Sequence, residues 1–65
     1  MRNLEVALRQ KNISNEAVAK LLNIHRNSHR NKLDGKTDFS ISEAFKIKRD
    51  LLPEYDMDFL FADQT

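Results

Sequence analysis

Residues 15–35, NEAVAKLLNIHRNSHRNKLDG, are the most informative stretch of this chain, because they predict two short helices joined by a tight turn. Ser14 is a good N-cap for a helix over about 15–22. Asn23 then suits a sharp turn, since asparagine is prominent among the residues other than glycine that adopt a positive φ. A second helix is predicted directly afterwards, over about 25–33.

The apolar residues of this stretch indicate how its two helices pack. Ala19 is expected where the first helix meets the second, since only a small side chain lets two helices approach at a steep angle across a tight turn. Larger apolar side chains hold the pair on the core. These are Val18, Leu22, Ile24 and Leu33.

The outer face of the second helix is left with polar side chains that can bond to base edges, and none of them is acidic. They are His25, Arg26, Asn27, Arg30 and Asn31. Arginine matches guanine, and asparagine matches adenine, in the major groove of DNA. The pattern therefore predicts a helix that enters this groove.

The sequence before this stretch predicts one more helix, over about 3–11. It would bury Leu4, Ala7 and Leu8, which recur at helical spacing. Asn12 can take the left-handed position that closes such a helix.

The sequence after it predicts two further helices. Ser40 and Glu43 have the spacing of a capping box, and Pro53 ends the helix that they open. Asp56 is expected to cap a last short helix. The residues expected to face the core are Ile41, Ala44, Phe45, Ile47 and Leu51, then Met57, Leu60 and Phe61. The predicted fold class is all-α, a compact bundle of about five short helices in one domain over residues 1–65.

The formal net charge of +1 hides an uneven distribution. Residues 1–36 carry eight Lys/Arg against three Asp/Glu, whereas residues 37–65 carry three against seven. This asymmetry suits a domain with one face toward a polyanion. There is no cysteine, no apolar run of membrane length and no signal-peptide pattern, so a cytoplasmic protein is expected.

Taken together, these residues resemble the lambda-repressor-like helix-turn-helix family of phage repressors and Cro-type proteins. The most specific likenesses are Ala19, Ile24, the run NKLDGK at 31–36 and the SEA at 42–44. The resemblance covers nearly the whole chain. It implies a five-helix fold and binding of double-stranded operator DNA, usually as a dimer, in transcriptional control of a phage or mobile element.

The resemblance also implies roles for single residues. Contacts to base edges are expected from His25, Arg26, Asn27, Arg30 and Asn31. Contacts to phosphates are expected from Asn15, Lys32 and Lys36. Asn15 matches a polar residue that also braces the recognition helix.

Three residues depart from the family pattern. Asn23 stands where glycine is usual, and Asp34, which would repel a nearby phosphate, stands where asparagine is frequent. His29 occupies a site normally filled by valine or isoleucine. It has two possible orientations: buried with a hydrogen bond, or outward against DNA.

A second copy is the expected protein partner, because one short helix reads only a few base pairs. Phe59 or Phe61, whichever projects outward, is the predicted dimer contact, with Met57 and Leu52 as neighbours. The alternative function is a helix-turn-helix protein-interaction module without selective DNA binding, whose acidic C-terminal half binds another protein.

Catalysis and metal binding are not expected. His25 and His29 have i, i+4 spacing, but they lack a third ligand. Ser28 beside them lacks an orienting acid and an oxyanion pocket. No cofactor, small-molecule substrate or membrane partner is predicted.

Overall fold

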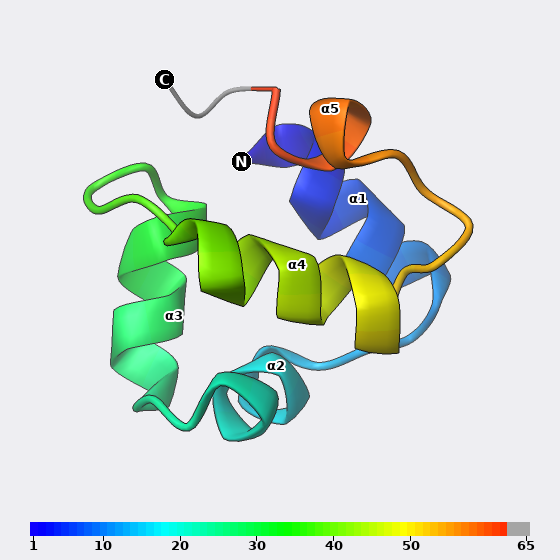
Figure 1. Cartoon of the computed structure of the whole chain (residues 1–65). Helices are drawn as coiled ribbons and strands as arrows, with labels where there is room; N and C mark the ends of the chain where they lie inside the picture. The colour runs from blue at the N-terminus through cyan, green and yellow to red at the C-terminus, as the bar shows by residue number, and fades with distance from the viewer. Residues whose placement is uncertain (63–65) are drawn as a thin grey trace.

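The computed structural model describes residues 1–62, and within this range it contains five helices and no strand (Figure 1). The helices are α1 (Arg2–Gln10), α2 (Asn15–Leu22), α3 (Arg26–Leu33), α4 (Ile41–Asp50) and α5 (Met57–Leu60). The fold is therefore all-α, as predicted. The molecule is a small globule measuring 26 × 25 × 19 Å.

The predicted caps and turns are present, except for the side-chain cap at Asp56. The hydroxyl of Ser14 accepts a hydrogen bond from the Ala17 amide at 3.0 Å. Ser40 and Glu43 form the complete capping box, in which each side chain accepts from the other residue's amide. Asn12 and Asn23 both have positive φ, 58° and 57°. Asp56 precedes α5 but makes no side-chain cap hydrogen bond.

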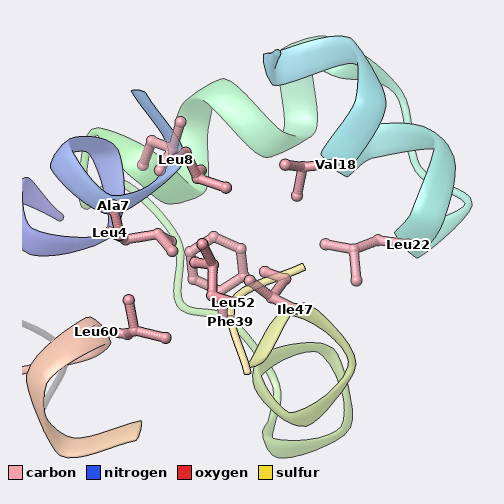
Figure 2. Packing of buried hydrophobic residues seen from close by; sticks show 10 residues of the cluster. Leu4, Ala7, Leu8, Val18, Leu22, Phe39, Ile47, Leu52 and Leu60 are labelled. Atoms are coloured by element: carbon pink, nitrogen blue, oxygen red, sulfur yellow. The ribbon is translucent and has the colours of Figure 1, made fainter. Parts of the chain in front are cut away.

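One apolar core lies between the helices. Figure 2 shows side chains from α1, α2, α4 and α5 converging on the space that holds Phe39. Its buried members are Leu4, Ala7, Leu8, Val18, Leu22, Leu33, Phe39, Ile47, Leu52 and Leu60.

Two predictions about the second half of the chain are wrong. Ile41 and Phe45 were expected in the core, but their exposed fractions are 77% and 55%. The reason is that α4 buries the side that carries Ala44 and Ile47, which leaves part of its wide apolar stripe uncovered. Leu52, expected beside a dimer contact, is fully buried.

The segment around α5 is fastened to α1. The side-chain Nδ2 of Asn3 donates a hydrogen bond to the Phe59 carbonyl at 2.9 Å, and the Tyr55 hydroxyl donates one to Gln10 Oε1 at 2.5 Å. Lys11 and Glu54 add a salt bridge of 2.7 Å. None of the helices within residues 1–62 is long and apolar enough to cross a membrane.

Candidate nucleic-acid interface

The turn between α2 and α3 sets the direction of α3. Asn23, in the left-handed conformation, donates to the Lys20 carbonyl at 3.1 Å, and Ile24 donates to the Ala19 carbonyl at 3.0 Å. Ala19 is almost fully buried. In Figure 1, α3 consequently lies at the left edge of the molecule with α2 at its lower end.

Two side chains organise the first turn of α3. His25 is its N-cap residue, and its Nδ1 accepts a hydrogen bond from the Asn27 amide at 3.1 Å. Asn15, in the first turn of α2, donates its amide to the Arg26 carbonyl at 3.3 Å. This hydrogen bond to the backbone of α3 is the kind of contact by which Asn15 would brace the recognition helix.

His29 points inward, so the buried orientation is correct. Its exposed fraction is 0%, and its ring lies edge-on to Phe39 with centroids 5.7 Å apart. Its Nδ1 is hydrogen-bonded to Oδ1 of Asn15. Burial, assisted by the neighbouring charge of Arg30, lowers the pKa of His29.

The opposite side of α3 is exposed and polar. Arg26, Asn27 and Asn31, the three strongest candidates for base contacts, are all exposed, as are His25 and Ser28. Because His29 and Leu33 bury the inner side, these polar groups face solvent. Lys36 is exposed in the turn that follows α3, and its backbone amide donates to the Asn31 carbonyl at 2.9 Å.

Arg30 differs from the other candidates, because acidic groups of the same chain hold its guanidinium. Its Nε and Nη2 donate to one oxygen of Asp34 at 3.2 and 2.9 Å, and Glu5 of α1 lies 3.5 Å away. The hydrogen bond from Arg30 lowers the pKa of Asp34. The guanidinium of Arg30 is therefore already paired with a carboxylate of the same chain.

Lys32 is also engaged within the molecule. Its ammonium donates to the Asp38 carbonyl at 2.9 Å, lies 3.3 Å from Glu43 and sits above the Phe39 ring. These contacts tie α3 to the start of α4. A phosphate contact by Lys32 remains a prediction, and it would require this cation to leave or share its present partners.

Phe59 and Phe61 have different surroundings. Phe59 is 43% exposed, whereas Phe61 is half-buried and packs edge-on against Phe39 at 5.4 Å. Phe59 is therefore the outward residue of the pair. Among residues 1–62 no group of three or more His, Cys, Asp or Glu could hold a metal ion.

The pairing of Arg30 with Asp34 and the use of His25 as a cap were not predicted from the sequence. The first has a visible signal, since arginine and aspartate four residues apart on a helix commonly pair. The second has none, because histidine is not among the preferred N-cap residues.

Comparison with models of protein families, with curated proteins and with solved structures finds no match for this chain.

Proposed function

We propose that this protein is a sequence-specific regulator of transcription that binds double-stranded DNA. In this proposal α2 and α3 form a helix-turn-helix, and α3 enters the major groove of an operator. The observation that carries the proposal is the exposed row of Arg26, Asn27 and Asn31 on a helix whose other side is fixed to the core.

The dimensions of α3 support this role. An α-helix with its side chains is about 10–12 Å across, which fits the major groove width of about 12 Å, and α3 has eight residues to lie in it. Arg26 and Asn27 stand in the first turn, where a recognition helix commonly contacts bases. Lys36 and the N-terminus of α2 flank the row and suit phosphates on either side.

Two copies on one operator fit the size of the molecule. A globule about 25 Å across covers about seven base pairs, at 3.4 Å per pair. So short a site gives little discrimination in a genome, and a second copy extends it. The resemblance to phage repressors further suggests a repressor of a phage or mobile element.

A protein-interaction module is the second candidate. It is favoured by the exposure of Ile41 and Phe45, one helical turn apart on α4, because large apolar side chains near one another on a surface often mark a protein contact. The pairing of Arg30 with Asp34 also removes one cation from the candidate DNA surface.

Selection of binding sites from random duplex DNA tests the proposal, followed by titration of the selected site at increasing salt. We expect one short motif to be enriched, and its affinity to fall steeply with salt as counterions are released. Failure to enrich any motif, with no preference among duplexes at low salt, would favour the interaction module.

A further inference from the structure

The outer side of α4 carries an apolar stripe that nothing within residues 1–62 covers. Ile41 and Phe45 are one helical turn apart, and they are the two most exposed large apolar residues in this range. Lys46, which follows Phe45 in the sequence and is also exposed, adds a positive charge to the solvent side of α4. We call Ile41, Phe45 and Lys46 the α4 stripe.

A second exposed surface has the opposite charge. The ring of Phe59 stacks on Tyr55 with centroids 6.0 Å apart, and Asp56 and Asp58, which lie between them in the sequence, are both exposed. Residues 51–62 contain three acidic residues and no lysine or arginine. We call Tyr55, Asp56, Asp58 and Phe59 the acidic aromatic patch.

The acidic aromatic patch is already held in place. The hydroxyl of Tyr55 donates to Gln10, and the carbonyl of Phe59 accepts from Asn3, so both aromatic residues are tied to α1. A surface that is ordered before binding loses less conformational entropy when a partner arrives. The patch is therefore suited to bind a partner without rearrangement.

We propose that the α4 stripe of one copy binds the acidic aromatic patch of a second copy. Each surface offers exposed apolar side chains, and their charges are complementary. Pairing of each surface with itself is disfavoured, because it would bring two Lys46 ammonium groups together, or Asp56 and Asp58 against the same carboxylates of the other copy. The contact is therefore head to tail, and it does not depend on DNA binding.

A head-to-tail contact leaves one free surface of each kind at the two ends of a pair. Association therefore continues beyond the dimer unless a ring closes. The contact is small, so we expect a dissociation constant on the order of 10⁻⁴ M for each junction. High salt should weaken it, because exposed charges are screened.

Sedimentation of the whole protein without DNA tests the contact. The wild type should form dimers and larger species as its concentration rises to about 1 mM. Phe45→Asp, with a damaged stripe, and Phe59→Asp, with a damaged patch, should each remain monomeric. Their equimolar mixture should form a 1:1 dimer and nothing larger, because one intact stripe and one intact patch remain. Ala17→Asp, an exposed change on α2, is the control and should associate as the wild type does.

Two results would overturn the proposal. One is a wild type that stays monomeric at these concentrations. The other is a mixture of the two variants that does not associate although the wild type does, since this points to a surface that pairs with itself. If melting curves show that Phe59→Asp does not fold, a charge exchange gives the same test: Lys46→Glu and Asp58→Lys should each weaken association about tenfold, and the double variant should recover it. A double variant that does not recover association would equally exclude the contact.

Discussion

His29 and Asn15 connect the middle of α3 to the first turn of α2 inside the protein. The N–H at Nδ1 of His29 donates to Oδ1 of Asn15, so the neutral ring carries its proton on Nδ1. Nε2 is then a bare acceptor, and it is buried with no hydrogen-bond partner among residues 1–62. A second proton would create a buried cation with an unpaired donor, which explains why the pKa of His29 is lowered.

Acid should therefore destabilise the fold through His29. Above the unfolded-state pKa of about 6.5 the ring is neutral in both states, and stability is full. As the pH falls below this value, His29 of the unfolded chain binds a proton before His29 of the folded protein does. The free energy of unfolding therefore decreases with falling pH until the lower folded-state pKa of His29 is passed. Replacing His29 with valine should raise the free energy of unfolding at pH 5.5 by about 1 kcal/mol. For so small a domain this corresponds to a rise in melting temperature of about 4–8 °C, and the rise should be smaller at pH 8. DNA affinity should change little.

Ser28→Ala is the matched control for this measurement, because Ser28 is exposed on the same helix and its side chain does not titrate in this pH range. This variant should keep the pH dependence of the wild type. Thermal melts of the three proteins at pH 5.5 and 8 decide the point. If His29→Val keeps the acid sensitivity of the wild type, a group other than His29 causes it.

The exposed row on α3 should determine the DNA sequence that is bound. Alanine at Arg26, Asn27 or Asn31 should each cost about 1–3 kcal/mol of binding and relax the preference at particular base pairs. Titration of each variant against the selected operator and its single-base variants measures both effects. Unchanged affinity and preference in Arg26→Ala and Asn31→Ala would mean that α3 does not contact the bases.

Lys36 should contribute affinity without sequence preference. Its replacement by alanine should weaken binding to all duplexes alike and lower the salt slope by about one, as expected for one lost phosphate contact. Arg49→Ala removes the same charge near the C-terminal end of α4, which lies away from α3 in Figure 1, and should leave the slope unchanged. Equal slopes for wild type and Lys36→Ala would contradict the phosphate contact.

Asp34 should restrain DNA binding by holding Arg30. Asp34→Asn removes the closer of the two carboxylates that pair with this guanidinium and leaves only Glu5, 3.5 Å away, to compete with a phosphate. We expect affinity to rise about tenfold and the salt slope to increase by about one, with little change in stability. Asp50→Asn, which removes the carboxylate paired with Arg49, is the matched control. A rise of the same size in that control would indicate a general effect of net charge.

The two phenylalanines near the end of the described chain should respond differently to substitution. Phe59→Asp should abolish cooperative operator binding by two copies while the monomer stays folded, because Phe59 projects outward. Phe61→Ala should instead lower stability by about 2–4 kcal/mol, because Phe61 packs against Phe39. Band-shift titrations and thermal melts distinguish these effects. One monomer per operator, at all protein concentrations, would refute the cooperative contact.

The helices and their ends could be predicted from the sequence, because the signals act between neighbours. Ser14 and the Ser40–Glu43 box cap their helices through amides three residues away. Asn23 turns the chain through its own φ. Leu33 marks the buried side of α3, and the polar residues around Arg26 lie on the other side. The residues of the candidate DNA surface could therefore also be predicted.

The contacts between helices that are distant in the sequence became known from the three-dimensional structure alone. The inward orientation of His29 depends on Asn15 and Phe39, and the restraint of Arg30 depends in part on Glu5, which is far away in sequence. The periodicity of α4 predicts an apolar side but not how much of it the other helices cover, and so Ile41 and Phe45 were misplaced. Composition and spacing determine which side chains a helix presents, whereas burial and ion pairing depend on surfaces brought together from distant parts of the chain.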